Sequence, residues 1–399
     1  MLTIITDKMT FGGNCLAKYE GKNIFVPYAV PGEKLQIEIT DSKKDYDVAK
    51  IISVDEASPK RIDPVCPNYQ LCGGCNMMHI DYDYQVELRK QILSDCFTRN
   101  KIQIPEIQTV TGSPLNYRAR FQLHDGCLEA KKSNEKVFIN NCPVAENSVN
   151  EYLKNTPVNC RPQGRCHIFG SAKAEPSFTV AVPPKKIDYN QPKNKKIKHY
   201  IKPRYNGITI DPSTCSTVTL CGKKISFDVQ GFFQSNLEVL EKTINLITSD
   251  LSGNNVLDMY SGCGTFSVFL ADKFNKVTLV EHNKAAIVFA EQNLAGTNHE
   301  SYGISGARWV KENASSIIQS NGMFDAVVID PPRSGIEKEV LDFLCNQKPP
   351  VIRLLSCDPA TNARDVQCLI EAGYKLNKLF LLDFYPQTSH IESLCFLEL

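Results

Sequence analysis

From about residue 232 onward, helix-like and strand-like patterns alternate, and no other feature of the chain limits its fold as strongly. Residues 235–249 place apolar side chains at a helical spacing, and the apolar run 255–259 is typical of a buried strand. Further buried-strand patterns follow at residues 277–280, 326–330 and 351–355. The alternation predicts a doubly wound α/β domain over residues 231–399.

The first 56 residues and the segment that follows them have different patterns. Residues 1–56 alternate apolar and polar positions between Gly and Pro turn signals, which predicts a small β-barrel. Residues 57–230 are turn-rich and contain cysteines and short strand-like runs, which predicts a central α+β domain. Because 399 residues exceed the usual size of one hydrophobic core, we expect a multidomain protein. The lysine-rich run 192–198 is either a solvated loop or an edge that contacts phosphates.

The charge and the cysteine count narrow the classes of function. The formal net charge is +1, so any affinity for nucleic acid must come from local basic patches. Sixteen cysteines without an export signal indicate reduced thiols, metal ligands or a catalytic cysteine, and not a disulfide framework. Apolar runs long enough to span a bilayer are absent from the sequence, so we expect a cytoplasmic protein that binds no membrane.

Acidic and glycine-rich residues follow several of the predicted strands. In an open parallel sheet, ligands bind beyond the carboxyl ends of the strands. The glycine turn 258–265 lets the backbone approach a ligand, and Glu281 ends the next strand about 20 positions on, where a carboxylate suits ribose hydroxyls. Asp330 precedes two prolines that stiffen the exit from a third strand. The glycine turn lacks the full G-x-G-x-x-G pattern for a pyrophosphate, which favours S-adenosylmethionine over a dinucleotide.

Cys357 directly follows a predicted strand, at the same sheet edge as Asp330. A cysteine is by default a small buried hydrophobic residue, and this interpretation fits Cys345, Cys368 and Cys395. Carbon C5 of a pyrimidine is a poor nucleophile, so its methylation usually requires a thiolate to add at C6 and a base to remove the C5 proton. Cys357 suits the first role, and Glu392 near the C-terminus supplies a carboxylate for the second.

Four motifs in one order resemble those of the RNA uracil-5-methyltransferase family. They are Phe232-Phe233-Gln234-Ser235-Asn236, Asp330-Pro331-Pro332-Arg333, Ser356-Cys357-Asp358-Pro359-Ala360-Thr361 and His390-Ile391-Glu392-Ser393. The resemblance implies that Cys357 is the nucleophile and Glu392 the proton acceptor. It also implies a Rossmann-like methyltransferase fold in which S-adenosylmethionine is held by Gln234, Tyr260, Glu281, Asn313 and Asp330.

Two positions depart from the family pattern. Asp358 follows the cysteine where asparagine is usual, and Thr265 continues the glycine turn where asparagine is common. Neither change removes a reacting group. If the Asp358 carboxylate lies close to the sulfur of Cys357, we expect it to disfavour the thiolate and to shift the pH dependence upward.

A group of cysteines in the central segment has the spacing of a metal site. Cys66, Cys72 and Cys75 form a C-x5-C-x2-C pattern, and Cys142 is a candidate fourth ligand. Four thiolates serve either tetrahedral zinc or an iron–sulfur cluster. The resemblance implies a [4Fe-4S] cluster with a structural or RNA-binding role, because the methyl transfer needs no electron. The rivals to Cys142 as the fourth ligand are Cys160 and Cys166.

The N-terminal segment resembles a TRAM domain, a small OB-like barrel, notably in Phe11-Gly12-Gly13 and in the run 26–33. Such barrels bind nucleic acid through basic and aromatic side chains. By resemblance, the barrel and the cluster together point to 23S ribosomal RNA, from which the enzyme would flip out a uridine. The alternatives are a transfer-RNA uracil-5-methyltransferase, an RNA-binding or assembly factor without activity, and a redox protein. No obligate protein partner is inferred.

Overall fold

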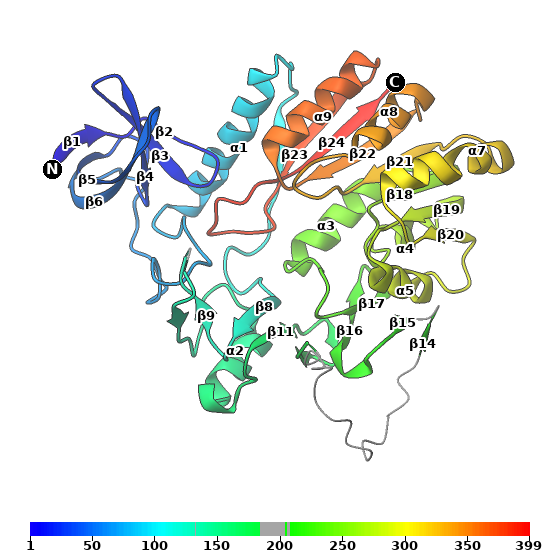
Figure 1. Cartoon of the computed structure of the whole chain (residues 1–399), viewed down its shortest axis with the longest axis horizontal. Coiled ribbons are helices and arrows are strands. Elements are labelled where there is room, and N and C mark those ends of the chain that lie inside the picture. Colours follow the sequence, from blue (N-terminus) through cyan, green and yellow to red (C-terminus); the bar gives the residue numbers. More distant parts are fainter. Residues whose placement is uncertain (132, 184–203, 206–207) are drawn as a thin grey trace, which may run out of the picture.

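The computed structural model describes residues 1–131, 133–183, 204–205 and 208–399 (Figure 1). The lysine-rich run 192–198 lies outside the described residues. Among the helices that are described, none combines the length and the apolar character that a membrane span requires.

The N-terminal segment folds into one curled sheet with the strand order β1-β5-β6-β4-β3-β2. Its strands are β1 (Leu2–Ile5), β2 (Lys8–Met9), β3 (Asn14–Tyr19), β4 (Lys22–Pro27), β5 (Lys34–Ser42) and β6 (Tyr46–Glu56). Alternate residues of β3 and β4, such as Cys15, Ala17, Ile24 and Val26, are buried on the inner face. The alternation in the sequence therefore forms the core of this small β unit.

A large sheet forms the C-terminal half of the molecule. In spatial order its described strands are β20 (His299–Tyr302), β19 (Phe274–Val280), β18 (Gly253–Met259), β21 (Ala326–Ile329), β22 (Val351–Ser356), β24 (Glu392–Glu398), β23 (Lys375–Leu382) and β7 (Ile107–Val110). The strands from β20 to β22 run parallel, whereas β24 runs antiparallel to both of its neighbours. This is the predicted doubly wound α/β pattern with an antiparallel extension.

Helices cover both faces of this sheet (Figure 1). The helices on one face are α6 (Gly306–Trp309), α7 (Ser315–Asn321), α8 (Lys338–Gln347) and α9 (Pro359–Glu371). The helices on the other face are α3 (Leu237–Thr248), α4 (Ser267–Leu270) and α5 (Lys284–Asn293). Neighbouring residues of β21 enter opposite cores: Val327 packs with the first group and Val328 with the second. Burial on both faces explains why these strands read as continuous apolar runs.

The predicted central segment 57–230 does not pack as one unit. Helix α1 (Tyr82–Arg99) packs against α9 and β23, and β7 pairs in parallel with β23 at the edge of the large sheet. Strands β16 (Cys215–Leu220) and β17 (Lys223–Asp228) share a hydrophobic core with α3 and α5. Both ends of the segment therefore belong to the C-terminal core, because their apolar side chains are buried there.

The rest of the central segment forms small sheets beside the large one (Figure 1). Its strands and helices are β8 (Arg120–His124), β9 (Leu128–Glu129), β10 (Lys136–Val137), α2 (Asn147–Asn155), η1 (Val158–Cys160), β11 (Arg165–Gly170), β12 (Ala174–Glu175), β13 (Phe178–Ala181), β14 (Arg204–Tyr205), β15 (Ile208–Thr209) and η2 (Pro212–Thr214). Strands β13, β11 and β8 form an antiparallel sheet that packs against α2.

Candidate active site

A large cavity lies at the carboxyl ends of the parallel strands, where an open α/β sheet binds its ligands. Its volume is about 920 Å³. The predicted site residues that line it are Gln234, Tyr260, Glu281, Asp330, Cys357 and Glu392. Most of them follow or begin a strand of the large sheet, which brings together residues that are far apart in the sequence.

The register of β22 and β24 places Cys357 beside Glu392. Ser356 pairs with Ser393 in this antiparallel ladder, so the next residues at that end, Cys357 and Glu392, lie opposite each other. Residues directly opposite in such a ladder have Cα atoms about 4.5–5.5 Å apart. Asp330 follows β21, which runs parallel to β22 on its other side. One thiol and two carboxyl groups therefore share one end of the cavity.

Burial and mutual repulsion raise the pKa values of these groups. Burial raises the pKa of the Cys357 thiol to about 11, with further contributions from the charges of Glu392 and Asp330. The guanidinium of Arg333 acts in the opposite direction. Burial, followed by the charge of Asp330, raises the pKa of Glu392 well above its ordinary value. Burial and the charge of Glu281 raise the pKa of Asp330 to about 7. At neutral pH the thiol is therefore protonated and its neighbours accept protons readily.

Asp358 does not act on Cys357 in the way that the sequence predicts. Its Oδ1 accepts hydrogen bonds from the backbone N–H groups of Ala360 at 3.0 Å and Thr361 at 2.9 Å, and so caps α9. The charges that raise the pKa of Cys357 are those of Glu392 and Asp330. The structure therefore gives Asp358 the role of a helix cap, because its carboxylate is bound to the free N–H groups of a helix start.

The glycine turn after β18 closes onto Glu281. Tyr260 has a left-handed backbone with a φ of 64°, and its N–H donates to the Val280 carbonyl at 2.8 Å. The Glu281 carboxylate accepts hydrogen bonds from the backbone N–H groups of Gly262 at 3.1 Å and Asn283 at 2.6 Å. Within the described residues, the buried hydroxyl of Ser261 has no hydrogen-bond partner. Because buried polar groups are normally paired, this turn suits a polar ligand in the cavity.

Gln234 and Asn313 differ in their relation to the cavity. Gln234 lies just before α3 and lines the cavity, and its Oε1 accepts a hydrogen bond from the Tyr385 hydroxyl at 3.4 Å. Asn313 lies in the π-helical turn η3 (Val310–Ala314) and is not one of the lining residues. This part of the chain reaches the cavity at residues 304–306, and α6 then leads away from it. The cofactor contact of Asn313 therefore stays a prediction from the family resemblance.

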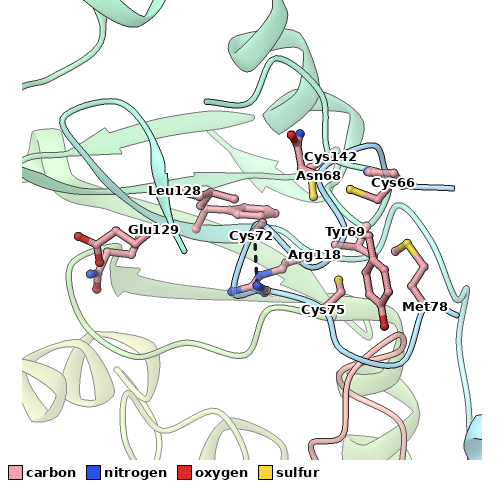
Figure 2. A pocket seen from close by; sticks show the side chains of 15 residues that line it. Cys66, Asn68, Tyr69, Cys72, Cys75, Met78, Arg118, Leu128, Glu129 and Cys142 are labelled. Carbon is pink, nitrogen blue, oxygen red and sulfur yellow. Dashed lines mark hydrogen bonds between the residues drawn. The ribbon is translucent and has the colours of Figure 1, made fainter. Parts of the chain in front are cut away.

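The predicted metal ligands meet at a second, smaller cavity of about 150 Å³. Figure 2 shows Cys66, Cys72, Cys75 and Cys142 around it. The rival cysteines do not line it, because Cys160 is exposed on η1 and Cys166 is buried in β11. Among the described residues, no group of His, Cys, Asp or Glu side chains is already arranged as a metal site. The thiols therefore surround one cavity without a coordinating geometry.

Arg118 brings positive charge to this four-cysteine cavity. Burial raises the pKa of Cys75 to about 12 and also raises the pKa values of Cys72 and Cys142. The Arg118 guanidinium, which lines the cavity, acts against this rise at all three thiols. In addition, the backbone N–H of Gly74 donates to Sγ of Cys72 at 3.3 Å. A half-buried cation and an N–H donor both favour the thiolate form that binds metal.

Comparison with known proteins identifies the family. Residues 214–399 match the sequence model of the family described as tRNA (Uracil-5-)-methyltransferase. An uncharacterized RNA methyltransferase of Treponema denticola is 38% identical, and the alignment covers 98% of this chain and 97% of that protein. The 23S rRNA (uracil(1939)-C(5))-methyltransferase RlmD of Shewanella amazonensis is 31% identical, with 97% and 93% covered. The chain belongs to the RNA uracil-5-methyltransferase family.

A solved structure shares the fold of this uracil-5-methyltransferase over its whole length. It is the tRNA (uracil-54, C5)-methyltransferase of Pyrococcus abyssi in complex with S-adenosyl-L-homocysteine. The TM-score is 0.73 at 23% identity, and 99% of this chain and 100% of that chain are covered. The likeness confirms the Rossmann-like fold of the large sheet.

Arg333, Tyr385 and His390 also line the methyltransferase cavity, although the sequence analysis assigned them no role. Burial lowers the pKa of His390, and the positive charge of Arg333 adds to this effect. Its ring lies 5.5 Å from the ring of Tyr385. Arg333 and His390 stand inside the family motifs, which could have drawn attention to them. Tyr385 lies in a loop without a recognisable pattern.

Proposed function

We propose that this enzyme methylates carbon C5 of a uridine in RNA, with S-adenosylmethionine as the methyl donor. The observation that carries the proposal is the meeting of Cys357, Asp330 and Glu392 at one end of the large cavity. Methylation of uracil C5 is also the activity in the names of several relatives.

The cofactor would be held by Gln234, Tyr260, Glu281 and Asp330. The Glu281 carboxylate lies at the end of β19, where a carboxylate accepts hydrogen bonds from ribose hydroxyls. The Ser261 hydroxyl, which has no hydrogen-bond partner among the described residues, and the Asp330 carboxyl offer further polar contacts in the same cavity. When bound, S-adenosylmethionine supplies an electrophilic methyl group on a positively charged sulfur. The carboxyl groups of the cavity suit that charge.

Cys357 would add to carbon C6 of the uracil ring. The thiol gives its proton to a carboxylate of the cavity, and a bond forms between its sulfur and C6. The electron pair of the C5–C6 double bond moves toward the C4 carbonyl oxygen, which makes C5 nucleophilic. Because the thiol has a pKa of about 11, a neighbouring proton acceptor is needed for this step at neutral pH.

Glu392 would remove the proton from C5 after the methyl group has been added. The C5–H bond breaks, its electron pair restores the C5–C6 double bond, and the bond between C6 and the sulfur of Cys357 breaks. Glu392 is suited to this step because it lies opposite Cys357 in the strand register. Its raised pKa makes the carboxylate a stronger base than an exposed glutamate.

The covalent mechanism is tested by the variant Cys357→Ala, which should lose all methylation of unmodified RNA. Cys345→Ala is the matched control, because Cys345 is equally half-buried but does not line the cavity. This control should keep wild-type activity. Turnover by Cys357→Ala would refute the covalent mechanism.

We further propose that Cys66, Cys72, Cys75 and Cys142 bind a [4Fe-4S] cluster. Four thiols around one cavity, beside the cation of Arg118, support this assignment. When bound, the cluster links Cys142 to the loop that holds the other three cysteines.

For the substrate we propose 23S ribosomal RNA, bound in part by a TRAM-like unit over residues 1–56. The support is the RlmD relative, which aligns with nearly the whole chain, including this N-terminal sheet. Transfer RNA is the alternative, because the solved structure with the same fold is a tRNA enzyme. Mapping of 5-methyluridine in a strain without this protein separates the two. Loss from 23S ribosomal RNA supports the proposal, and loss from transfer RNA alone contradicts it.

A further inference from the structure

The loop 383–391 between β23 and β24 carries Tyr385 and His390 and leads directly into Glu392. Most of its side chains are buried, and Gln387 has a left-handed backbone with a φ of 67°. A residue other than glycine rarely adopts this conformation, which costs roughly 1–2 kcal/mol. Contacts from outside the loop must therefore hold it in place.

One set of contacts comes from α1. The Arg89 guanidinium and the Asp383 carboxylate form a buried ion pair at 2.5 Å, and the Tyr82 hydroxyl donates to the same carboxylate at 2.7 Å. Gln85 and Gln387 exchange two hydrogen bonds. The Gln85 Nε2 donates to Oε1 of Gln387 at 2.9 Å, and the Gln387 backbone N–H donates to Oε1 of Gln85 at 3.1 Å. Helix α1 thus fixes the start and the middle of the loop.

A second set comes from the two residues that follow Cys75. The backbone N–H groups of Asn76 and Met77 donate to the Gln387 carbonyl at 3.2 and 3.0 Å. The Asn76 side chain donates to the Ser389 hydroxyl at 2.9 Å and accepts from the Ser389 N–H at 2.8 Å. The backbone that directly follows Cys75 is therefore hydrogen-bonded to the strained residue of the loop.

A third contact comes from Tyr117, whose hydroxyl donates to the Pro386 carbonyl at 2.9 Å. The Tyr117 ring forms a small hydrophobic core with Met78 and Val144. The cysteines that pack against this core are Cys66, Cys75 and Cys142. The side chain of Tyr117 therefore connects the surroundings of the four-cysteine cavity to the loop that precedes Glu392.

We propose that the four-cysteine site, through Asn76 and Tyr117, holds the loop 383–391 in the conformation that aims Glu392 at the C5 proton of the substrate. Asn76 and Tyr117 are then positioning residues for proton removal. The inference rests on the proposed function, in which Glu392 is the base. It assigns to the four-cysteine site a role in the last chemical step and not in electron transfer.

Loss of the contacts that hold the loop 383–391 should impair one particular step of the reaction. Addition of Cys357 to C6 can use Asp330, which follows β21, as the acceptor of the thiol proton, whereas removal of the C5 proton needs Glu392 in place. A loosened loop should therefore slow the second step more than the first. The protein–RNA adduct, in which sulfur is still bonded to C6, should accumulate on a denaturing gel. A general loss of stability would lower all steps together and would not raise the adduct fraction.

Tyr117→Phe and Tyr374→Phe form a matched pair for this test. Tyr374 is also buried, and its hydroxyl donates to the Pro349 carbonyl at 2.7 Å, but it lies at the opposite end of β23. We expect Tyr117→Phe to lower turnover about 3- to 10-fold, the range for one lost hydrogen bond, and to raise the adduct fraction. Hydrogen exchange in the peptide 383–391 should be faster. Tyr374→Phe should change none of these three quantities, and both variants should bind S-adenosylmethionine like the wild type.

Asn76→Ala removes both side-chain bonds to Ser389, so its adduct fraction should exceed that of Tyr117→Phe. Cys142→Ala should also accumulate the protein–RNA adduct and show faster hydrogen exchange in residues 383–391. If this variant does not fold, the comparison of Tyr117→Phe with Tyr374→Phe still tests the inference. Equal adduct fractions in Tyr117→Phe and Tyr374→Phe would overturn the inference. Failure of the proposed function has a different signature: Cys357→Ala would still turn over, or Glu392→Gln would form no adduct.

Discussion

The two cavities of this enzyme are built in different ways. The residues around Cys357 stand at the ends of neighbouring strands, so the hydrogen-bonded register of one sheet sets their positions. The cysteines of the smaller cavity stand on loops. Isolated hydrogen bonds hold these loops, such as the bond from the Cys72 N–H to the Asn68 carbonyl at 2.9 Å. The large cavity is therefore formed by the fold itself, whereas the small one needs its ligand to reach a final geometry.

The largest expected effect is the loss of the cluster from the small cavity without a loss of cofactor binding in the large cavity. Anaerobically prepared wild type should show the broad visible absorbance of an iron–sulfur cluster, and Cys142→Ser should lose it completely. Its affinity for S-adenosylmethionine should change less than about threefold, because Tyr260 and Glu281 stand on the large sheet. Zinc as the only metal of the wild type would refute the assignment of the cluster.

The reverse variant is Glu281→Gln, which leaves the four cysteines untouched. It should weaken the binding of S-adenosylmethionine about 10- to 100-fold, since hydrogen bonds to a charged group contribute about 1.5–3 kcal/mol. Isothermal titration calorimetry measures this change, and the visible spectrum should stay that of the wild type. If Cys142→Ser and Glu281→Gln each lost both the visible absorbance and the affinity for S-adenosylmethionine, the two cavities would not be built independently.

Substitution of one leucine in the large sheet and one in the cysteine loop should change the free energy of unfolding by different amounts. Leu257 is fully buried in β18, and Leu257→Ala should lower the free energy of unfolding by about 2–5 kcal/mol. Leu71 lies in the cysteine loop and is 62% exposed, so Leu71→Ala should stay within about 0.5 kcal/mol of the wild type. Urea unfolding of the cluster-loaded protein measures both. If both variants lost a similar amount of unfolding free energy, the two cavities would not differ in the way described above.

The electrostatics of the large cavity can be measured at the thiol itself. The rate of alkylation of Cys357 should rise with pH toward a midpoint of about 11, because only the thiolate reacts. Glu392→Gln removes a negative charge and should lower this midpoint, whereas Arg333→Met removes a positive charge and should raise it. Mass spectrometry of the peptide that contains Cys357 gives the rate, and the peptide with Cys345 serves as an internal control. Shifts in the opposite directions would refute this account of the site.

The smallest effect is expected at Asp358. Asp358→Ala removes the cap of α9 and should cost about 0.5–2 kcal/mol of stability, whereas Asp358→Asn keeps a capping side chain and should be nearly neutral. Thermal unfolding measures the difference. Neither variant should move the alkylation midpoint of Cys357 as far as Glu392→Gln does. A larger shift from Asp358→Asn would restore the role that the sequence predicts for this carboxylate.

The sequence predicted the parts of the fold and of the site that depend on local pattern. Continuous apolar runs located the buried strands β18, β21 and β22, and the residues just after strands, such as Asp330 and Cys357, could be expected at one sheet edge. The spacing of the cysteines likewise predicted a common cavity for them.

The sequence could not predict features that depend on a distant partner. The run 107–110 is short and contains two polar residues, and nothing in it indicates that β7 pairs with β23, more than 260 residues later. The contacts of α1 and Tyr117 with the loop 383–391 are equally non-local. Asp358 is a different case, since an acidic residue before Pro359 is itself a signal for a helix cap. The expected effect on the thiol overlooked this local signal.

The most direct test of the account is to trap the covalent intermediate and locate its bond. Glu392→Gln enzyme is incubated with S-adenosylmethionine and an unmodified fragment of 23S ribosomal RNA, and the denatured adduct is digested with nuclease and protease. The account predicts a methylated uridine attached to Cys357. A nucleotide attached to another cysteine, or continued turnover without an adduct, would contradict it.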